Sequence, residues 1–144
     1  RAVVADRNGQ VYAGYVKAAR GGELDADAAT GGILLVQRSG AVVQVAGAPL
    51  ARPGVDVDPA FGLGCVSGLA LSRDGLTLVA VDTAARLVVC FDVDPDNGAL
   101  DGRANLVRVP AEDGPPTCVV IDNESHFWVG HWHTGALTRH SLRT

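Results

Sequence analysis

Two histidines near the C-terminal end, His131 and His133, form a pair of residues that could bind a metal. Residues two apart on a β-strand point to the same face, so imidazoles at this spacing could hold zinc or another transition metal. A third ligand would have to come from elsewhere, and the sequence indicates none. The pair also runs into a turn at Thr134 and Gly135, which favours solvated or hydrogen-bonded histidines. His131 and His133 are therefore an alternative metal site.

An acidic segment at positions 92–98, with the sequence DVDPDNG, resembles the start of a calcium-binding loop. A loop of the EF-hand type has glycine at its sixth position and a bidentate glutamate at its twelfth. Here those positions hold Asn97 and Arg103. Asp, Pro, Asn and Gly are the residues that tight turns select, so we expect a hairpin turn. Asp82, just before Thr83, is likewise expected to cap a turn.

The elements that position these residues follow from a short module, in which an apolar run, a polar turn and a second apolar run succeed one another. Its three copies occupy residues 3–14, 68–80 and 118–130. They are spaced about 50 to 65 residues apart, as expected for propeller blades with variable loops. A second hairpin follows each copy, at 33–45, at 87–98 and, cut short, at 136–140. Two hairpins per repeat predict four-stranded blades.

The predicted fold class is all-β. No apolar 3.6-residue period persists for a dozen residues, and Gly and Pro interrupt almost every candidate helix. About ten strands amount to two and a half to three blades, whereas a closed propeller typically has four to eight. We therefore expect residues 1–144 to be a single partial domain from a larger propeller. The alternative is a half-ring that closes by self-pairing with a second copy.

Two irregular stretches, 17–32 and 46–64, interrupt the predicted blades. Long loops at one end of a propeller can roof the channel and select its ligand, although such segments are also often simple surface loops. The sequence leaves both interpretations open.

The charge distribution excludes several classes of partner. The formal net charge is −4, and acidic and basic residues are scattered, so there is no basic stripe for nucleic acid. No apolar run approaches the length that spans a bilayer, so no membrane partner is expected. The N-terminal end carries no visible targeting signal. We favour the cytoplasm, with localisation otherwise open.

Four segments together carry a family resemblance. They are SGLALSRDGLTLVAVDT at 67–83, FDVDPDNGAL at 91–100, GPP at 114–116 and FWV at 127–129. Their order and spacing over residues 66–140 resemble the senescence marker protein, gluconolactonase and regucalcin family, and residues 3–45 match more loosely. Members of that family are six-bladed propellers. The resemblance thus implies that the chain is a fragment, about three blades, of a six-bladed β-propeller.

The resemblance also implies a chemistry. Family members open sugar lactones with water at a divalent-metal site, usually calcium, at the mouth of the central channel. The metal acts as a Lewis acid on the lactone carbonyl, and a carboxylate takes a proton from the attacking water. In the family pattern the metal ligands are a Glu in the first blade, an Asn before the Gly-Leu-Ala strand and an Asp after a Pro. An Arg/Asn pair binds substrate.

Carried onto this sequence, the pattern changes at each position that can be placed. Ser67 stands where the family has Asn, and Thr117 stands where it has the Asp that serves as catalytic base. The loose alignment puts Arg1 at the substrate-binding position. Hydroxyl groups coordinate calcium weakly, bring no negative charge and cannot act as a general base near neutral pH.

Two functional hypotheses follow. The first is a gluconolactonase-like hydrolase of a sugar lactone or related ester that uses Ca²⁺ or another divalent metal at a degenerate site. The second is a non-catalytic propeller scaffold, without a cofactor, that binds a small molecule or a partner protein.

Overall fold

The structure, a computed structural model, describes residues 2–16, 31–47 and 63–142. Within these ranges its regular structure is β apart from one short 3-10 turn, η2 (Ala111–Asp113), so the all-β prediction is confirmed. None of the described residues forms a helix long and apolar enough to cross a membrane.

The described strands form three antiparallel sheets, and strands that follow one another in sequence are neighbours in each sheet. The first sheet contains β1 (Ala2–Ala5), β2 (Val11–Val16), β3 (Gly31–Val36) and β4 (Val42–Gly47). The second contains β5 (Val66–Leu71), β6 (Thr77–Asp82), β7 (Leu87–Val93) and β8 (Leu100–Arg108). The third contains β9 (Pro116–Ile121), β10 (His126–His131) and β11 (Leu137–Ser141). Each sheet begins with one copy of the repeated module, as predicted.

The strands beside the two irregular stretches are longer than expected. Gly31 and Gly32 belong to β3, and Ala46 and Gly47 belong to β4, although the sequence placed them within loops 17–32 and 46–64. The glycine pair allows close contact: a Cβ on Gly32 would lie 2.4 Å from the carbonyl oxygen of Ala46. Glycine therefore serves the β3–β4 pairing here instead of ending it. Residues 17–30 and 48–62 lie outside the described residues.

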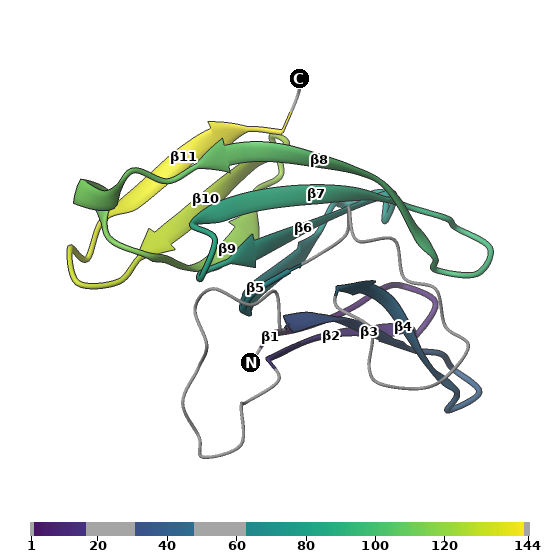
Figure 1. Ribbon diagram of the computed structural model, residues 1–144. Helices are drawn as coiled ribbons and strands as arrows, with labels where there is room; N and C mark the ends of the chain where they lie inside the picture. The colour runs from purple at the N-terminus through teal and green to yellow at the C-terminus, as the bar shows by residue number, and fades with distance from the viewer. Residues whose placement is uncertain (1, 17–30, 48–62, 143–144) are drawn as a thin grey trace, which may run out of the picture.

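The first strands of the three sheets lie next to one another, with β5 between β1 and β9 (Figure 1). The approach of β5 to β9 is so close that a Cβ on Gly68 would lie 3.0 Å from the Cα of Cys118. Sheets whose first strands meet in this way are arranged radially about a common axis, as propeller blades are.

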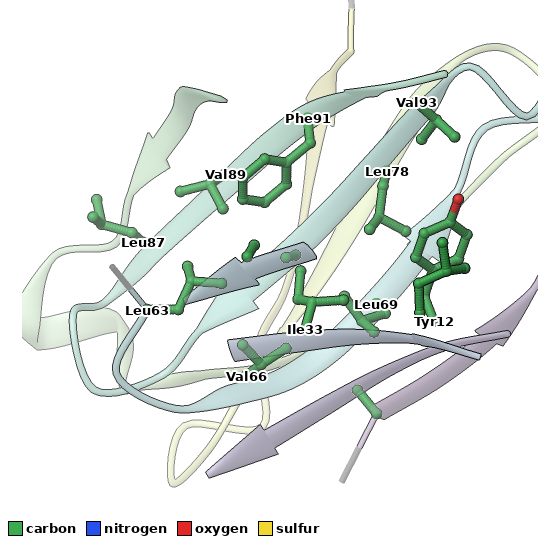
Figure 2. Packing of buried hydrophobic residues seen from close by; sticks show 14 residues of the cluster. Tyr12, Ile33, Leu63, Val66, Leu69, Leu78, Leu87, Val89, Phe91 and Val93 are labelled. Carbon is green, nitrogen blue, oxygen red and sulfur yellow. The ribbon is translucent and has the colours of Figure 1, made fainter. Parts of the chain in front are cut away.

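The second sheet is buried on both faces along β5, β6 and β7, whereas β8 is largely exposed. This burial explains the almost unbroken apolar sequence of β6. One face packs on the first sheet through residues such as Ile33, Leu78 and Phe91 (Figure 2). The other packs on the third sheet through residues such as Val81 and Phe127. Burial on both faces replaces the alternation of apolar and polar residues seen in half-exposed strands.

A buried tyrosine joins the first two sheets at one end. Tyr12 is fully buried, and its hydroxyl donates a hydrogen bond to the carbonyl oxygen of Gly98 at 3.0 Å. Burial, helped by the charges of Asp6 and Asp94, raises the pKa of Tyr12 to about 12. The hydroxyl therefore remains a donor at neutral pH and holds the β7–β8 turn against the first sheet.

Candidate functional site

Ser67 and Thr117, the two positions expected at the channel mouth, lie near the starts of neighbouring strands, β5 and β9. The Ser67 Oγ lies 2.6 Å from the Oγ1 of Thr83, which donates to the carbonyl oxygen of Pro116 at 2.7 Å. Thr83 has one hydroxyl proton, so Ser67 is the donor in the first of these bonds. The hydrogen-bond chain ends on the peptide unit that joins Pro116 to Thr117. The structure therefore brings the two predicted positions together.

The Thr117 hydroxyl also has a partner in the protein. Its Oγ1 donates to the carbonyl oxygen of Gly130 at 3.3 Å, a long bond. Thr117 and Ser67 are both half-buried, so neither side chain is wholly enclosed by protein. The two hydroxyls form a neutral polar surface at the junction of the second and third sheets.

Asp82 is the acidic residue that packs beside this junction, and its carboxylate is used in the structure. It is 1% exposed. Its Oδ2 accepts from the N–H of Gly64 at 2.7 Å, and its Oδ1 accepts from Cys65 at 3.0 Å and Ala85 at 3.1 Å. The predicted turn cap is confirmed, and the same carboxylate also fixes the chain entering β5.

The residues at these strand starts do not fit a calcium ion. Calcium takes six to eight oxygen ligands that include carboxylates, whereas Ser67 and Thr117 offer two neutral hydroxyls already bonded to protein. Among the described residues, three possible metal ligands gather only at Asp122, Glu124 and His126, beyond the far end of β9. Arg1, the expected substrate-binding residue, lies outside the described part of the chain.

The alternative pair, His131 and His133, does not share a strand face, so the geometry expected for it is wrong. β10 ends at His131, and His133 has a φ of 71°, in a turn. His131 is 6% exposed, whereas His133 is exposed. The register of β10 against β9 shifts at a bulge between Gly130 and His131, so that His131 pairs with Pro116. Because β10 ends at His131, His133 does not continue the strand and the two imidazoles are not held on one face.

His131 instead shares a hydroxyl with His140. The Nε2 atoms of these residues lie 2.8 Å and 2.9 Å from the Oγ1 of Thr138. Burial, and secondarily the charge of His131, lowers the pKa of His140. The Nδ1 of His131 is buried without a hydrogen-bond partner among the described residues. The spacing of the histidines along the chain does not indicate this arrangement, because it depends on the register of β10 against β11.

The acidic segment 92–98 is a hairpin turn, as predicted. The Oδ1 of Asp94 accepts from the N–H of Asp96 at 2.8 Å, and the N–H of Gly98 donates to the carbonyl oxygen of Asp94 at 2.8 Å. Gly98 has a φ of 76°, a conformation that favours glycine. The carboxylate of Asp94 stabilises the turn, as such residues commonly do.

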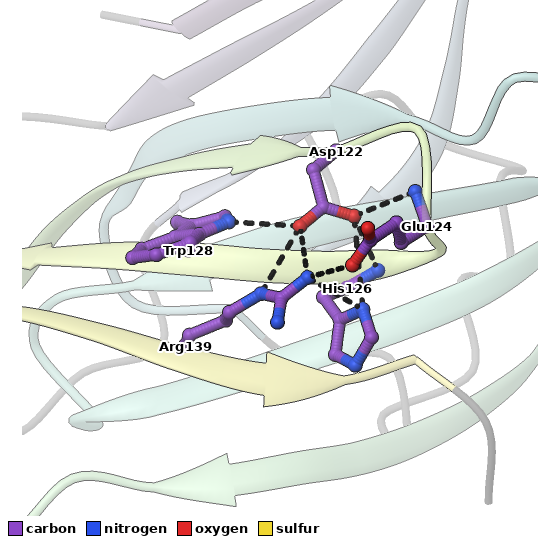
Figure 3. A network of polar contacts seen from close by, with 5 residues as sticks. All are labelled: Asp122, Glu124, His126, Trp128 and Arg139. Atoms are coloured by element: carbon purple, nitrogen blue, oxygen red, sulfur yellow. Dashed lines mark hydrogen bonds and ion pairs between the residues drawn. The ribbon is translucent and has the colours of Figure 1, made fainter.

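A polar network on the third sheet was not anticipated (Figure 3). Asp122 accepts hydrogen bonds from the N–H of His126 at 3.0 Å, from the Trp128 indole at 3.0 Å and from Arg139 at 2.9 Å. The hydrogen bonds, led by that from His126, hold the pKa of Asp122 well below its usual range. Arg139 also pairs with Glu124. The guanidinium thus occupies the place that a cation would need.

Three consecutive antiparallel sheets whose first strands meet at one axis define a partial β-propeller, and comparison with known proteins identifies its family. The model of the SMP-30/gluconolactonase/LRE-like region matches residues 2–143. The chain belongs to this family.

Curated relatives agree with this assignment. The chain is 25% identical over 138 residues to pentonolactonase XacC of Haloferax volcanii, an alignment that covers 96% of this chain and 40% of that protein. It is 30% identical over 73 residues to regucalcin of Danio rerio, covering 51% of this chain and 25% of the relative. The chain therefore spans well under half the length of these relatives.

Solved structures show the same fold. A calcium-binding regucalcin from Agrobacterium tumefaciens superimposes with a TM-score of 0.72 at 21% identity, over 96% of this chain and 40% of that one. A gluconolactonase from Xanthomonas campestris gives a TM-score of 0.68 at 20% identity, over 97% and 42%. The radial arrangement of sheets thus matches three of the blades in such propellers.

Proposed function

We propose that the protein hydrolyses a sugar lactone or a related ester. The observation that carries this proposal is the family match across residues 2–143, supported by the pentonolactonase relative that covers 96% of the chain. The arrangement of the strands supports it as well, because the positions expected at the channel mouth, Ser67 and Thr117, lie near the starts of adjacent first strands.

We assign Ser67 and Thr117 to substrate contact. A sugar lactone carries several hydroxyl groups, and serine and threonine can both donate to and accept from such groups. Both side chains are half-buried, and the 3.3 Å bond of Thr117 to Gly130 is long enough to exchange for a substrate hydroxyl at small cost. Neither hydroxyl can act as a general base near neutral pH, so a different residue has to take the proton from the attacking water.

A divalent cation is the cofactor expected from the family resemblance. The described residues near the starts of β5 and β9 do not fit calcium, so a cation there would take its charged ligands from elsewhere in the protein.

Hydrolysis of aldono-1,4-lactones and aldono-1,5-lactones by the full-length protein tests the proposal. Acid release above the spontaneous rate is expected for at least one sugar lactone. If the full-length protein does not accelerate any lactone in the panel, with or without added calcium, the proposal fails.

The second candidate is a non-catalytic propeller that binds a small molecule or a partner protein. It is favoured by one observation: a neutral Thr117 stands where the resemblance predicts a carboxylate. If the wild-type protein lacks lactonase activity, the double variant Ser67→Asn with Thr117→Asp distinguishes a decayed enzyme from a binding scaffold. A gain of lactone hydrolysis would indicate a decayed enzyme, whereas continued inactivity with intact folding would favour a binding scaffold.

A further inference from the structure

The three copies of the polar turn lie beyond the ends of β1, β5 and β9, opposite to Ser67 and Thr117. The first residue of a turn closes it: the Oδ1 of Asp6 accepts from the N–H groups of Asn8 and Gln10, both at 2.8 Å. Ser72 closes the second copy by accepting from the N–H of Thr77 at 2.9 Å. The side chain at the first position of these turns is therefore used within its own blade.

The side chain at the second position of each turn does not close its turn by a hydrogen bond. In the first two blades it is an arginine, Arg7 or Arg73, and in the third it is Asn123. All three are exposed, and neither arginine makes a hydrogen bond or ion pair with the described residues. Two guanidinium groups at equivalent positions of neighbouring blades are thus left with their donors unused.

Two hollows lie beside these arginines. One, of about 370 Å³, lies between the turns that follow β1, β5 and β7. The other, of about 430 Å³, lies between the turns that follow β5 and β9 and includes Asn123. Both hollows are lined by Arg7, Ser72, Arg73 and Asp74. Volumes of this size suit small-molecule ligands.

Carboxylates also line the hollows, and they already accept hydrogen bonds from the protein. Asp6, Asp74 and Asp94 accept within their own turns, whereas Asp122 also accepts from Trp128 and Arg139 on the neighbouring strands. Asp74 accepts from the Ser72 hydroxyl at 2.6 Å and from the N–H of Leu76 at 3.0 Å. These two bonds are the main causes that lower the pKa of Asp74, and the charge of Arg7 adds the smallest share. Arg7 therefore lies within electrostatic reach of the second blade. The polar groups of the hollows that lack a hydrogen-bond partner among the described residues are mainly the N–H donors of Arg7 and Arg73.

We propose that the two hollows form one binding site for a small oxyanion, a carboxylate or phosphate group on a hydroxyl-bearing molecule. A guanidinium matches the two oxygens of such a group with parallel N–H donors. The hydroxyls of the ligand would meet Ser72, Asn123 and the carboxylates of the turns. The neighbouring carboxylates can accept hydrogen bonds from ligand hydroxyls, so hydroxyl groups beside the anionic group are expected to add affinity. The proposal does not rest on lactone hydrolysis, which is assigned to the opposite end of the same strands.

Titration of the full-length protein with gluconate, inorganic phosphate and glucose, followed by calorimetry or NMR, tests the site. Gluconate or phosphate is expected to bind, with gluconate indicating a sugar acid and phosphate alone indicating a phosphorylated ligand, and glucose is expected not to bind. Arg7→Gln combined with Arg73→Gln should weaken anion binding by about tenfold or more. Arg38→Gln, the same change in an exposed turn residue away from the hollows, is the matched control.

Three results would overturn the proposal. They are binding of neither anion, equal binding of glucose, or the same loss of affinity in Arg38→Gln as in the double variant. Both arginines are exposed and make no hydrogen bond or ion pair within residues 2–16, 31–47 and 63–142, so the variants should unfold at the wild-type temperature. Should the double variant unfold early, Arg7→Lys with Arg73→Lys, which keeps the charge but not the planar fork, is expected to weaken binding in its place.

Discussion

The hydroxyl oxygens of Ser67 and Thr83 lie 2.6 Å apart, and through this contact the start of β5 is bonded to the end of β6 and onward to β9. The second bond of Thr83, to the carbonyl oxygen of Pro116, couples the second sheet to the third where the predicted channel mouth lies. Removing it tests whether the junction depends on polar contacts as well as on the apolar cluster below it.

Thr83→Val should destabilise the protein by about 1 to 2 kcal/mol, because it removes both hydrogen bonds of a half-buried hydroxyl. Urea unfolding measures the change. Thr83→Ser keeps the hydroxyl and is expected to recover most of the loss. Equal losses in the two variants would mean that the methyl group, and not the hydrogen-bond chain, supports the junction.

Asp82→Ala should cost more, about 3 kcal/mol, because it leaves three backbone N–H groups without their acceptor in a buried place. Asp96→Ala, at an exposed turn position, serves as the control and should change stability by less than about 0.5 kcal/mol. Thermal or urea unfolding of the two variants gives the comparison. A loss at Asp82 no larger than that at Asp96 would refute its role as a cap.

Much of the fold could be predicted from the sequence, because the residues that determine each hairpin lie close together along the chain. Each hairpin carries its own turn residues, and the caps at Asp82 and Asp94 follow from the residue types that turns select. The loop boundaries were missed at Gly31 and Gly32, since the sequence does not show that glycine is needed there for close strand contact.

The candidate sites were less predictable, because they depend on register and on strand ends. The His131 and His133 pair fails where a bulge and a turn end β10. The Asp122 network needs Arg139, which reaches it only because Arg139 pairs with Trp128 across β10 and β11. No spacing along the chain indicates that pairing.

The Asp122 network makes stability fall in acid. The pKa of Asp122 is lower in the folded protein than its unfolded value of about 3.9, so its contribution is complete above that value and is lost as the pH falls through the folded pKa. Asp122→Asn should therefore be less stable than wild type at pH 6, and the difference should shrink below about pH 4. Urea midpoints across this range measure it, and a constant difference would contradict the account.

Protonation of His140 is expected to cause a second loss of folding stability, at a higher pH than that of Asp122. Its pKa is lowered by burial and then by His131, so the unfolded chain binds the proton more readily. Stability should be complete above the unfolded pKa of about 6.5 and decline below it, and His140→Gln should flatten this part of the profile. His133→Gln, at an exposed position, should leave it unchanged. The same profile in both variants would exclude His140 as its source.

The most direct test of the account is the kcat/KM for sugar-lactone hydrolysis by the full-length protein and its Thr117→Ala variant, with unfolding free energies measured in parallel. We expect kcat/KM to fall by about tenfold, the effect of losing one hydrogen bond to substrate, with stability changed by less than about 1 kcal/mol. Thr134→Ala, an exposed threonine in the turn after β10, should keep wild-type activity. Unchanged kcat/KM in Thr117→Ala would contradict the placement of Thr117 at the substrate.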